Sequence, residues 1–303
     1  MAVFDPTLEQ ARSRTMQKFL AVMTMVYNEI DFLPIWLRHY AAAVGPENCY
    51  VLDHGSTDGS TDNLGRVNVI RIPRSPMDEE RRCKFISEFC SSMLTWYDAF
   101  AYTDVDEMLV ADPAVAPDLV TLSRNASQDV LTAFGVNVLH RMGHDLPLTG
   151  DQPISAQRRW IYPTAAMAKP LIIRRAVNWP PGFHSYDGPP VFCGLFNMHL
   201  AQVDYDIALR RQAKRRSVQW ATAIEKFHPH KADDSAVYED FMRWSSKPIV
   251  EDVVMNETCR HYRRFRERIS LSANGREGLL FQIEMNIWSR VLWLMPERFV
   301  GIF

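Results

Sequence analysis

The sequence predicts an α/β fold, a doubly wound and mostly parallel sheet over residues 1–203, with a mostly helical region, residues 204–303, packed on it. Two observations carry this prediction. In the first hundred residues, apolar runs of strand length alternate with segments of helical periodicity. Repeated strand–helix–strand crossovers imply parallel strands covered by helices on both faces. At 303 residues the chain is long enough to bury a large core.

The elements of the first part follow in order. Continuous apolar runs are typical of strands covered on both faces. The first predicted helix ends at Gly45-Pro46, a strong stop signal. The second begins with Ser75 as N-cap and Pro76 in the first turn. The predicted strands are 19–26, 49–53, 67–72 and a run ending at Asp104, and the predicted helices are 33–44, a short one after residue 60, and 75–97.

The second part alternates less regularly. Further strands are expected at 130–139 and 169–174, and an apolar stretch at 195–200. Residues 141–163 are polar and contain Pro and Gly, which predicts a loop. An apolar helix is expected from Gly275 onward, with one stripe that packs on the domain or, as the alternative, lies in a membrane interface. Its members are Leu280, Ile283, Ile287, Val291 and Leu294.

Composition narrows the class of protein. The net charge is −2, so the protein has no overall positive charge that would favour nucleic acid as a partner. The five cysteines are odd in number and form no Cys-x-x-Cys pair, which favours reduced thiols. The N-terminus is not a signal peptide, and no apolar run is long enough to span a bilayer. A cytoplasmic protein is expected, with peripheral association at the inner face of a membrane left open.

The most informative motif is Asp104-Val105-Asp106-Glu107, which follows a short apolar run. Three carboxylates held this close repel one another unless a cation lies between them. Oxygen ligands of this kind suit Mg²⁺ or Mn²⁺. The alternative is an acidic surface turn after a strand.

Other polar residues follow neighbouring predicted strands. Asn28 and Glu29 come after the first strand, and Asp53 after the second. Ligands of open parallel sheets bind beyond the carboxyl ends of the strands, so these residues and Asp104 are expected to converge there. The chain has neither a G-x-G-x-x-G nor a Walker motif, so neither kind of loop cradles a phosphate.

Three segments together resemble the nucleotide-sugar half of a GT-A glycosyltransferase of the family 2-like group. They are Tyr27-Asn28-Glu29, the run from Asp53 to Gly59, and the run from Thr103 to Met108. The resemblance covers roughly residues 19–110. It implies a Rossmann-type nucleotide-binding half, an inverting transfer from a nucleoside-diphosphate sugar, with a UDP-sugar as the expected donor, and a Mn²⁺ or Mg²⁺ cofactor. The implied acceptor is a glycan or glycolipid.

The resemblance also implies roles for individual residues. Tyr27, Asn28 and Glu29 would line the nucleotide pocket, Asp53 would bind base or ribose, Asp104 would approach ribose and metal, Asp106 would bind the metal, and His199 would lie near the diphosphate and metal. His184 competes with His199 for that role.

A transfer of this kind needs a general base on the acceptor side, usually Asp or Glu. Asp187, in an aromatic-rich loop over residues 179–190, is the candidate. Alternatively, Asp187 is a turn residue before Gly188. Asp53 likewise has an alternative role as the cap of the next helix. His199 could be a hydrogen-bonded core histidine.

Two other functions compete with a glycosyltransferase. A nucleotidyltransferase also activates phosphates with carboxylates and a metal, but usually carries a Gly-rich basic loop near its N-terminus. The third interpretation is a catalytically inactive module that binds a nucleotide or sugar.

Overall fold

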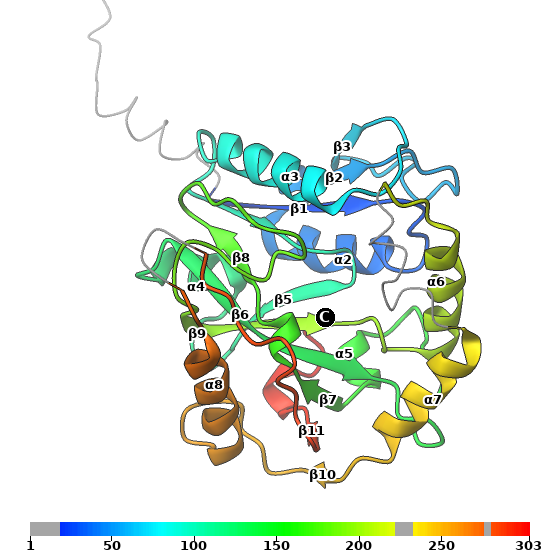
Figure 1. Cartoon of the computed structure of the whole chain (residues 1–303), viewed down its shortest axis with the longest axis vertical. Helices are drawn as coiled ribbons and strands as arrows, with labels where there is room; N and C mark the ends of the chain where they lie inside the picture. The colour runs from blue at the N-terminus through cyan, green and yellow to red at the C-terminus, as the bar shows by residue number, and fades with distance from the viewer. Residues whose placement is uncertain (1–18, 222–232, 276–279) are drawn as a thin grey trace, which may run out of the picture.

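The computed structural model describes residues 19–221, 233–275 and 280–303 (Figure 1). Its centre is an 11-stranded sheet, which confirms the predicted α/β class. The strands are β1 Leu20–Val26, β2 Cys49–Asp53, β3 Asn68–Arg71, β4 Ala99–Tyr102, β5 Glu107–Ala111, β6 Val130–Leu139, β7 Trp160–Pro163, β8 Pro170–Ile173, β9 Phe192–His199, β10 Ile249–Val250 and β11 Leu292–Leu294.

The amino-terminal part of the sheet is parallel and covered on both faces. β1 pairs in parallel with β2 and β4, and β2 with β3. Side chains alternate along these strands: Val22 and Val51 belong to the core under α2 (Leu33–Val44), whereas Met23 and Leu52 belong to the core under α3 (Glu79–Met93). Figure 1 shows the two helices on opposite sides of β1. This is the doubly wound arrangement that the sequence predicts.

Beyond β4 the sheet becomes mixed. β8 runs antiparallel between β4 and β6, and β9 pairs in parallel with β6 and antiparallel with β5. β10 and β11, from the C-terminal part of the chain, extend the same sheet past β7. The division into residues 1–203 and 204–303 stays a prediction. The remaining helices are α4 Leu119–Asn125, α5 Ile154–Gln157, α6 Tyr205–Ser217, α7 Asp234–Ser245 and α8 Arg260–Ser272.

Several local predictions are wrong. α3 is capped by Asp78, whose side chain accepts from the Arg81 amide, and not by Ser75. The predicted short helix after residue 60 is a series of turns, and the predicted loop at 141–163 contains α5 and β7. Tertiary contacts give these segments partners that local patterns do not reveal.

The predicted helix after Gly275 is also wrong in residues 280–303, which hold β11 and a single 3₁₀ turn, while 276–279 lie outside the described residues. Leu292 and Trp293 are buried, and Trp293 pairs with Ile161 on β7. The backbone hydrogen bonds that an open sheet edge offers outweigh the weak helical periodicity of this segment.

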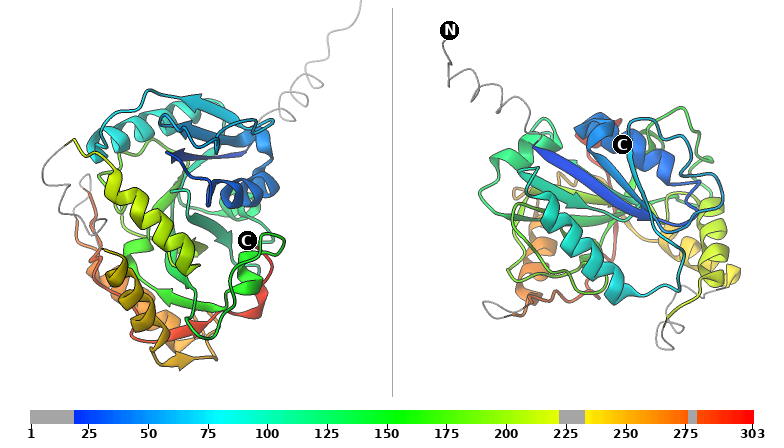
Figure 2. Two further views of the ribbon diagram at one scale, coloured as in Figure 1. Left: turned by 90° about the vertical axis from the view of Figure 1, so that its right-hand side faces the viewer. Right: turned by 90° about the horizontal axis from the view of Figure 1, so that it is seen from above.

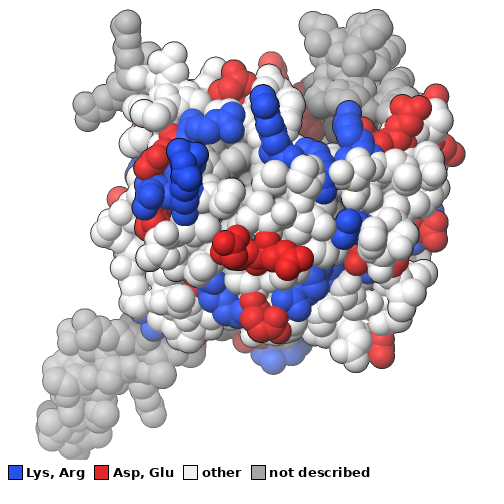
Figure 3. All heavy atoms as spheres, turned by 90° about the horizontal axis from the view of Figure 1, so that it is seen from below, with Lys and Arg blue, Asp and Glu red and all other residues white. Residues whose placement is uncertain are grey.

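The surface and the thiols add two observations. All five cysteines are unpaired, and Cys49, Cys83 and Cys90 are buried. Figure 3 shows basic and acidic side chains interspersed over one face of the molecule. In the described part of the chain, no helix has the length and apolarity needed to cross a membrane.

Candidate functional site

The structure brings the acidic motif and His199 together at one edge of the sheet. Asp104 and Asp106 follow the carboxyl end of β4, and Glu107 opens β5. His199 ends β9 and lies opposite Glu107 in the antiparallel register of β5 and β9. Since β4, β6 and β9 run in the same direction, this is the carboxyl edge at which a ligand of an α/β sheet is expected.

Asp104 and Glu107 share one buried lysine. Lys169 Nζ donates to Glu107 Oε1 at 2.6 Å and to Asp104 Oδ2 at 3.2 Å. Asp104 also accepts hydrogen bonds from Arg82 and from the Tyr102 hydroxyl. Burial alone would raise the pKa of Asp104, but Arg82 and Lys169 hold it well below its usual range. Burial raises the pKa of Glu107 despite Lys169.

Asp106 is paired with a residue that is distant in the sequence. Arg211 Nη1, on α6, donates to Asp106 Oδ2 at 2.6 Å, and His199 Nε2 lies 3.4 Å from the same oxygen. Burial would raise the pKa of Asp106, yet Arg211 lowers it well below its ordinary value. His199 Nδ1 donates to the Asn137 side-chain oxygen at 2.6 Å, which fixes the ring orientation.

Two further carboxylates belong to the cluster: Glu79, which pairs with Arg82, and Glu29. Glu29 is buried, accepts a hydrogen bond from Lys214 on α6, and has Arg211 Nε 3.7 Å from its Oε2. Lys214 Nζ also donates to the Asn28 carbonyl at 2.7 Å. Asn28 has a φ of 54°, a conformation that asparagine tolerates, and its side chain accepts from the Thr57 amide. The end of β1 is thereby joined both to α6 and to the loop after β2.

Cationic side chains offset the charge of this cluster. Within the described residues, every carboxylate of the cluster has a basic partner: Glu29 has Lys214, Glu79 has Arg82, Asp104 has Arg82 and Lys169, Asp106 has Arg211, and Glu107 has Lys169. A bound cation is therefore not needed to offset the repulsion between the carboxylates, and binding of Mn²⁺ or Mg²⁺ stays a prediction. The described residues also contain no group of three or more His, Cys, Asp or Glu side chains placed to hold a metal. The donors implied for Mn²⁺ or Mg²⁺ are engaged by arginine and lysine, so they do not fit the ion as arranged.

Asp53 lies at the same edge, but its side chain points towards the loop that follows β2 and forms hydrogen bonds there. It is buried, its Oδ1 accepts from the Ser56 amide at 2.7 Å, and its Oδ2 accepts from the Thr61 hydroxyl at 2.9 Å. Burial acts to raise its pKa, and these hydrogen bonds lower it below the ordinary value. Both oxygens thus shape the loop after β2. Contact with a base or ribose stays a prediction.

A pocket of about 370 Å³ opens beside the cluster, between α3 and the carboxyl ends of β1 to β3. Met25 and Leu52 contribute apolar surface to it, and Arg82, which pairs with Asp104, forms part of its wall. Near it, the Arg74 guanidinium stacks on the Tyr27 ring at 3.7 Å from the ring centroid and contacts His54. An aromatic ring, a guanidinium and an apolar wall are suited to a flat heterocycle with an anionic substituent.

His184 lies close enough to Lys169 and Asp104 for their charges to act on it. Burial, followed by Lys169, lowers its pKa to about 3. Gly182 shapes the turn before it: its φ is +84°, and a Cβ there would lie 2.5 Å from the His184 ring. His184 is a neutral neighbour of the cluster, whereas His199 contacts Asp106 directly.

The sequence did not identify most of the cations. Arg82, Arg211 and Lys214 lie in charge runs that are typical of solvated helix faces. A usable signal was spacing, because residues 211, 214 and 215 recur at helical intervals and so share one face of α6.

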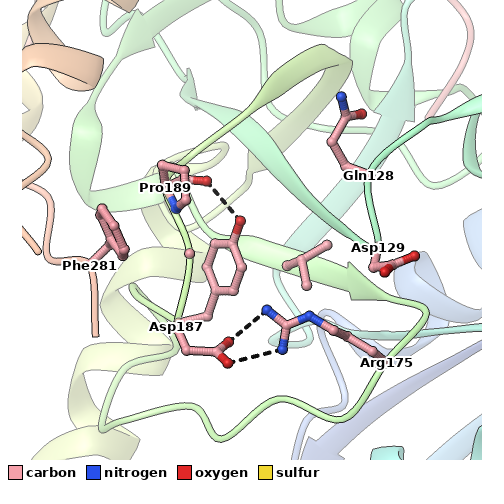
Figure 4. Close-up of a pocket in the computed structure, with 9 residues that line it drawn as sticks. Gln128, Asp129, Arg175, Asp187, Pro189 and Phe281 are labelled. Atoms are coloured by element: carbon pink, nitrogen blue, oxygen red, sulfur yellow. Dashed lines mark hydrogen bonds and ion pairs between the residues drawn. The ribbon is translucent and has the colours of Figure 1, made fainter. Parts of the chain in front are cut away.

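Asp187, the predicted base, is not brought into this cluster. It lines a second pocket, of about 580 Å³, with Gln128, Asp129 and Arg175, and Arg175 holds both of its oxygens, at 2.8 and 3.1 Å (Figure 4). Arg175 follows β8, whose antiparallel pairing with β4 places it beyond the amino end of β4. Asp104 follows the opposite end of the same strand.

Comparisons with known proteins give only distant likenesses. No family model matches the chain, and no curated protein matches it. A mannosyltransferase, PcManGT from Pyrobaculum calidifontis in complex with GDP-Man and Mn²⁺, aligns over 88% of this chain and 69% of its own, with 14% identity and a TM-score of 0.27. The mannose-1-phosphate geranyltransferase of Thermus thermophilus aligns over 74% of this chain and 68% of its own, with 12% identity and a TM-score of 0.30.

Proposed function

We propose that the protein transfers a sugar from a nucleoside-diphosphate sugar to an acceptor hydroxyl. The observation that carries the proposal is the carboxyl edge of the sheet. There, the ends of β1, β4 and β9 and the helix α6 bring carboxylates and cations together beside a pocket of about 370 Å³. Such a cluster is suited to a ligand that is part polar sugar, part anion and part heterocycle.

Each part of the cluster has a role in this reaction. The diphosphate gains charge as the glycosidic bond breaks, and preorganised cations nearby stabilise that charge. The nucleoside would occupy the pocket under α3, near Tyr27 and Arg74, with the sugar towards Asp104. Inversion follows from the resemblance, whereas the role of Asp187 as base rests on its place in the loop 179–190; both remain predictions.

The experiment incubates the purified protein with a panel of nucleoside-diphosphate sugars and monitors both melting temperature and products. The true donor is expected to raise the melting temperature by mass action. Slow release of nucleoside diphosphate and free sugar would support the proposal. Release of pyrophosphate from a nucleoside triphosphate would favour a nucleotidyltransferase, and binding without turnover would favour an inactive module.

A matched pair of variants guards against a contaminating activity. Asp104→Asn alters the cluster and should greatly reduce nucleoside diphosphate release. Asp240→Asn removes a carboxylate that pairs with Arg243 on the surface of α7, and should leave release unchanged. Equal activities in the two variants would contradict the proposed site.

A further inference from the structure

The basic residues of α6 differ in how they are paired. Arg210 pairs with Asp31, Arg211 with Asp106, Lys214 with Glu29, and Arg216 with Asp234. α6 lies beyond the carboxyl end of β1 (Figures 1 and 2). This helix therefore supplies two of the cations of the cluster from one face, through Arg211 and Lys214.

Arg215 is the exception on that face. It follows Arg211 by four residues and so lies on the same side of the helix. It is partly buried, and its side chain makes no ion pair or hydrogen bond with the other described residues, although the charges of Asp106 and Glu29 act on it. The donors of this partly buried guanidinium are therefore free to bind a ligand that accepts hydrogen bonds from them.

The described part of the cluster is balanced in charge when Arg215 is counted. In the described part of the cluster, five carboxylates (Glu29, Glu79, Asp104, Asp106 and Glu107) face five basic side chains (Arg82, Lys169, Arg211, Lys214 and Arg215). No negative charge is left over to hold a divalent ion. Burial and then Arg211 lower the pKa of Arg215 to about 10, so the group is still charged at neutral pH.

We infer that α6 takes the place of a divalent metal ion at this site, and that Arg215 binds the diphosphate of the donor directly. This inference rests on the proposed function. A planar guanidinium matches two phosphate oxygens at once, and it stabilises charge on the leaving diphosphate without metal coordination. Arg211 and Lys214 act through Asp106 and Glu29, which they hold in place.

The test is calorimetric binding of UDP and GDP to protein treated with EDTA, repeated with added Mn²⁺. Wild-type protein is expected to bind one of the two equally well in both conditions. Arg215→Ala should weaken that binding about 10- to 100-fold in EDTA, the range for hydrogen bonds to a charged partner. Binding of the matching nucleoside, uridine or guanosine, should be unchanged because it has no phosphate.

Arg210→Ala is the matched control, since it removes an equal charge from the same helix but from a pair with Asp31. It should leave binding of UDP and GDP unchanged, and Arg215→Lys should restore part of the affinity. Melting curves check that each variant is folded, and Arg215→Lys serves if Arg215→Ala does not fold.

The outcomes separate the two proposals. Binding that requires Mn²⁺ would overturn the inference and leave the proposed function standing. Wild-type affinity in Arg215→Ala would overturn the assignment of Arg215. Failure to bind any nucleoside diphosphate, with or without Mn²⁺, would overturn the proposed function itself.

Discussion

Two aspartate–arginine pairs, Asp106–Arg211 and Asp187–Arg175, lie towards opposite edges of the sheet and differ most in their access to water. The side chains of Asp106 and Arg211 are 5% and 9% exposed, whereas those of Asp187 and Arg175 are 47% and 38% exposed. Solvent screens the exposed pair, so that pair adds little to stability. Breaking the buried pair leaves a charge without compensation. The same two residue types therefore form a buried ion pair that stabilises the fold at one edge and an exposed ion pair that adds little stability at the other.

The largest expected effect comes from breaking the buried pair. Asp106→Asn should lower the free energy of unfolding by about 2–4 kcal/mol, because Arg211 keeps its charge and loses the nearer of its two anionic partners, Glu29 being 3.7 Å away. Carboxylates that repel one another would predict the reverse, a variant more stable than wild type without metal. Sugar transfer should fall to near background. Denaturant unfolding and product assays measure the two effects.

The double variant Asp106→Asn/Arg211→Gln is the control for this prediction. Removing both charges should recover part of the stability lost in the single variant. If the single variant is as stable as wild type, water reaches Arg211 and the ion pair does not contribute to the stability of the fold.

A lower pH should reduce the free energy of unfolding because of His184, which is buried in its neutral form. Its pKa falls from 6.5 to about 3 on folding, so the unfolded chain takes up a proton first as the pH drops. Stability from the neutral ring is present above pH 6.5 and is lost progressively towards pH 3. By pH 5 the loss should reach about 1–2 kcal/mol.

Unfolding experiments across pH 4–8 on wild type and His184→Gln measure this contribution as a difference. The variant should show a shallower decline between about pH 6.5 and 5. Parallel curves for the two proteins would mean that His184 is protonated in the folded state and faces solvent.

The next prediction concerns Asp53, a buried carboxylate whose hydrogen bonds come mostly from neutral donors. Asp53→Ala should cost about 1–2 kcal/mol, since the Ser56 amide and the Thr61 hydroxyl both lose their acceptor. Thr61→Val removes one of these hydrogen bonds and should cost roughly half as much. If Asp53 also contacts the nucleotide, UDP or GDP affinity falls in Asp53→Ala beyond the change seen in Thr61→Val.

The smallest effect on stability is expected at the exposed pair. Asp187→Asn should change the free energy of unfolding by less than about 1 kcal/mol. The sequence-based prediction that Asp187 is the base requires a loss of about 10²–10⁴-fold in turnover with unchanged donor affinity. Arg175→Ala is the comparison: near wild-type turnover in both variants would leave Asp187 as a surface residue paired with Arg175.

The sequence was sufficient where the signal is local. β1, α2, β2 and β6 lie where periodicity and stop signals predict them, because a buried strand or an amphipathic helix is encoded by neighbouring residues. The placement of Asn28, Glu29 and Asp104 at one edge also followed, since parallel strands bring their carboxyl ends together.

Only the tertiary structure decided which charges meet. Arg211 and Asp106 are 105 residues apart, and Lys169 and Glu107 are 62 apart, so no local pattern links them. β11 is a second example: its sequence resembles an apolar helix, but pairing with the edge strand β7 makes it a strand. By itself the sequence determined a row of carboxylates at the end of a parallel sheet. Long-range packing of α6 and β8 supplied their cations, because ion pairing depends on which side chains the fold brings within a few ångströms.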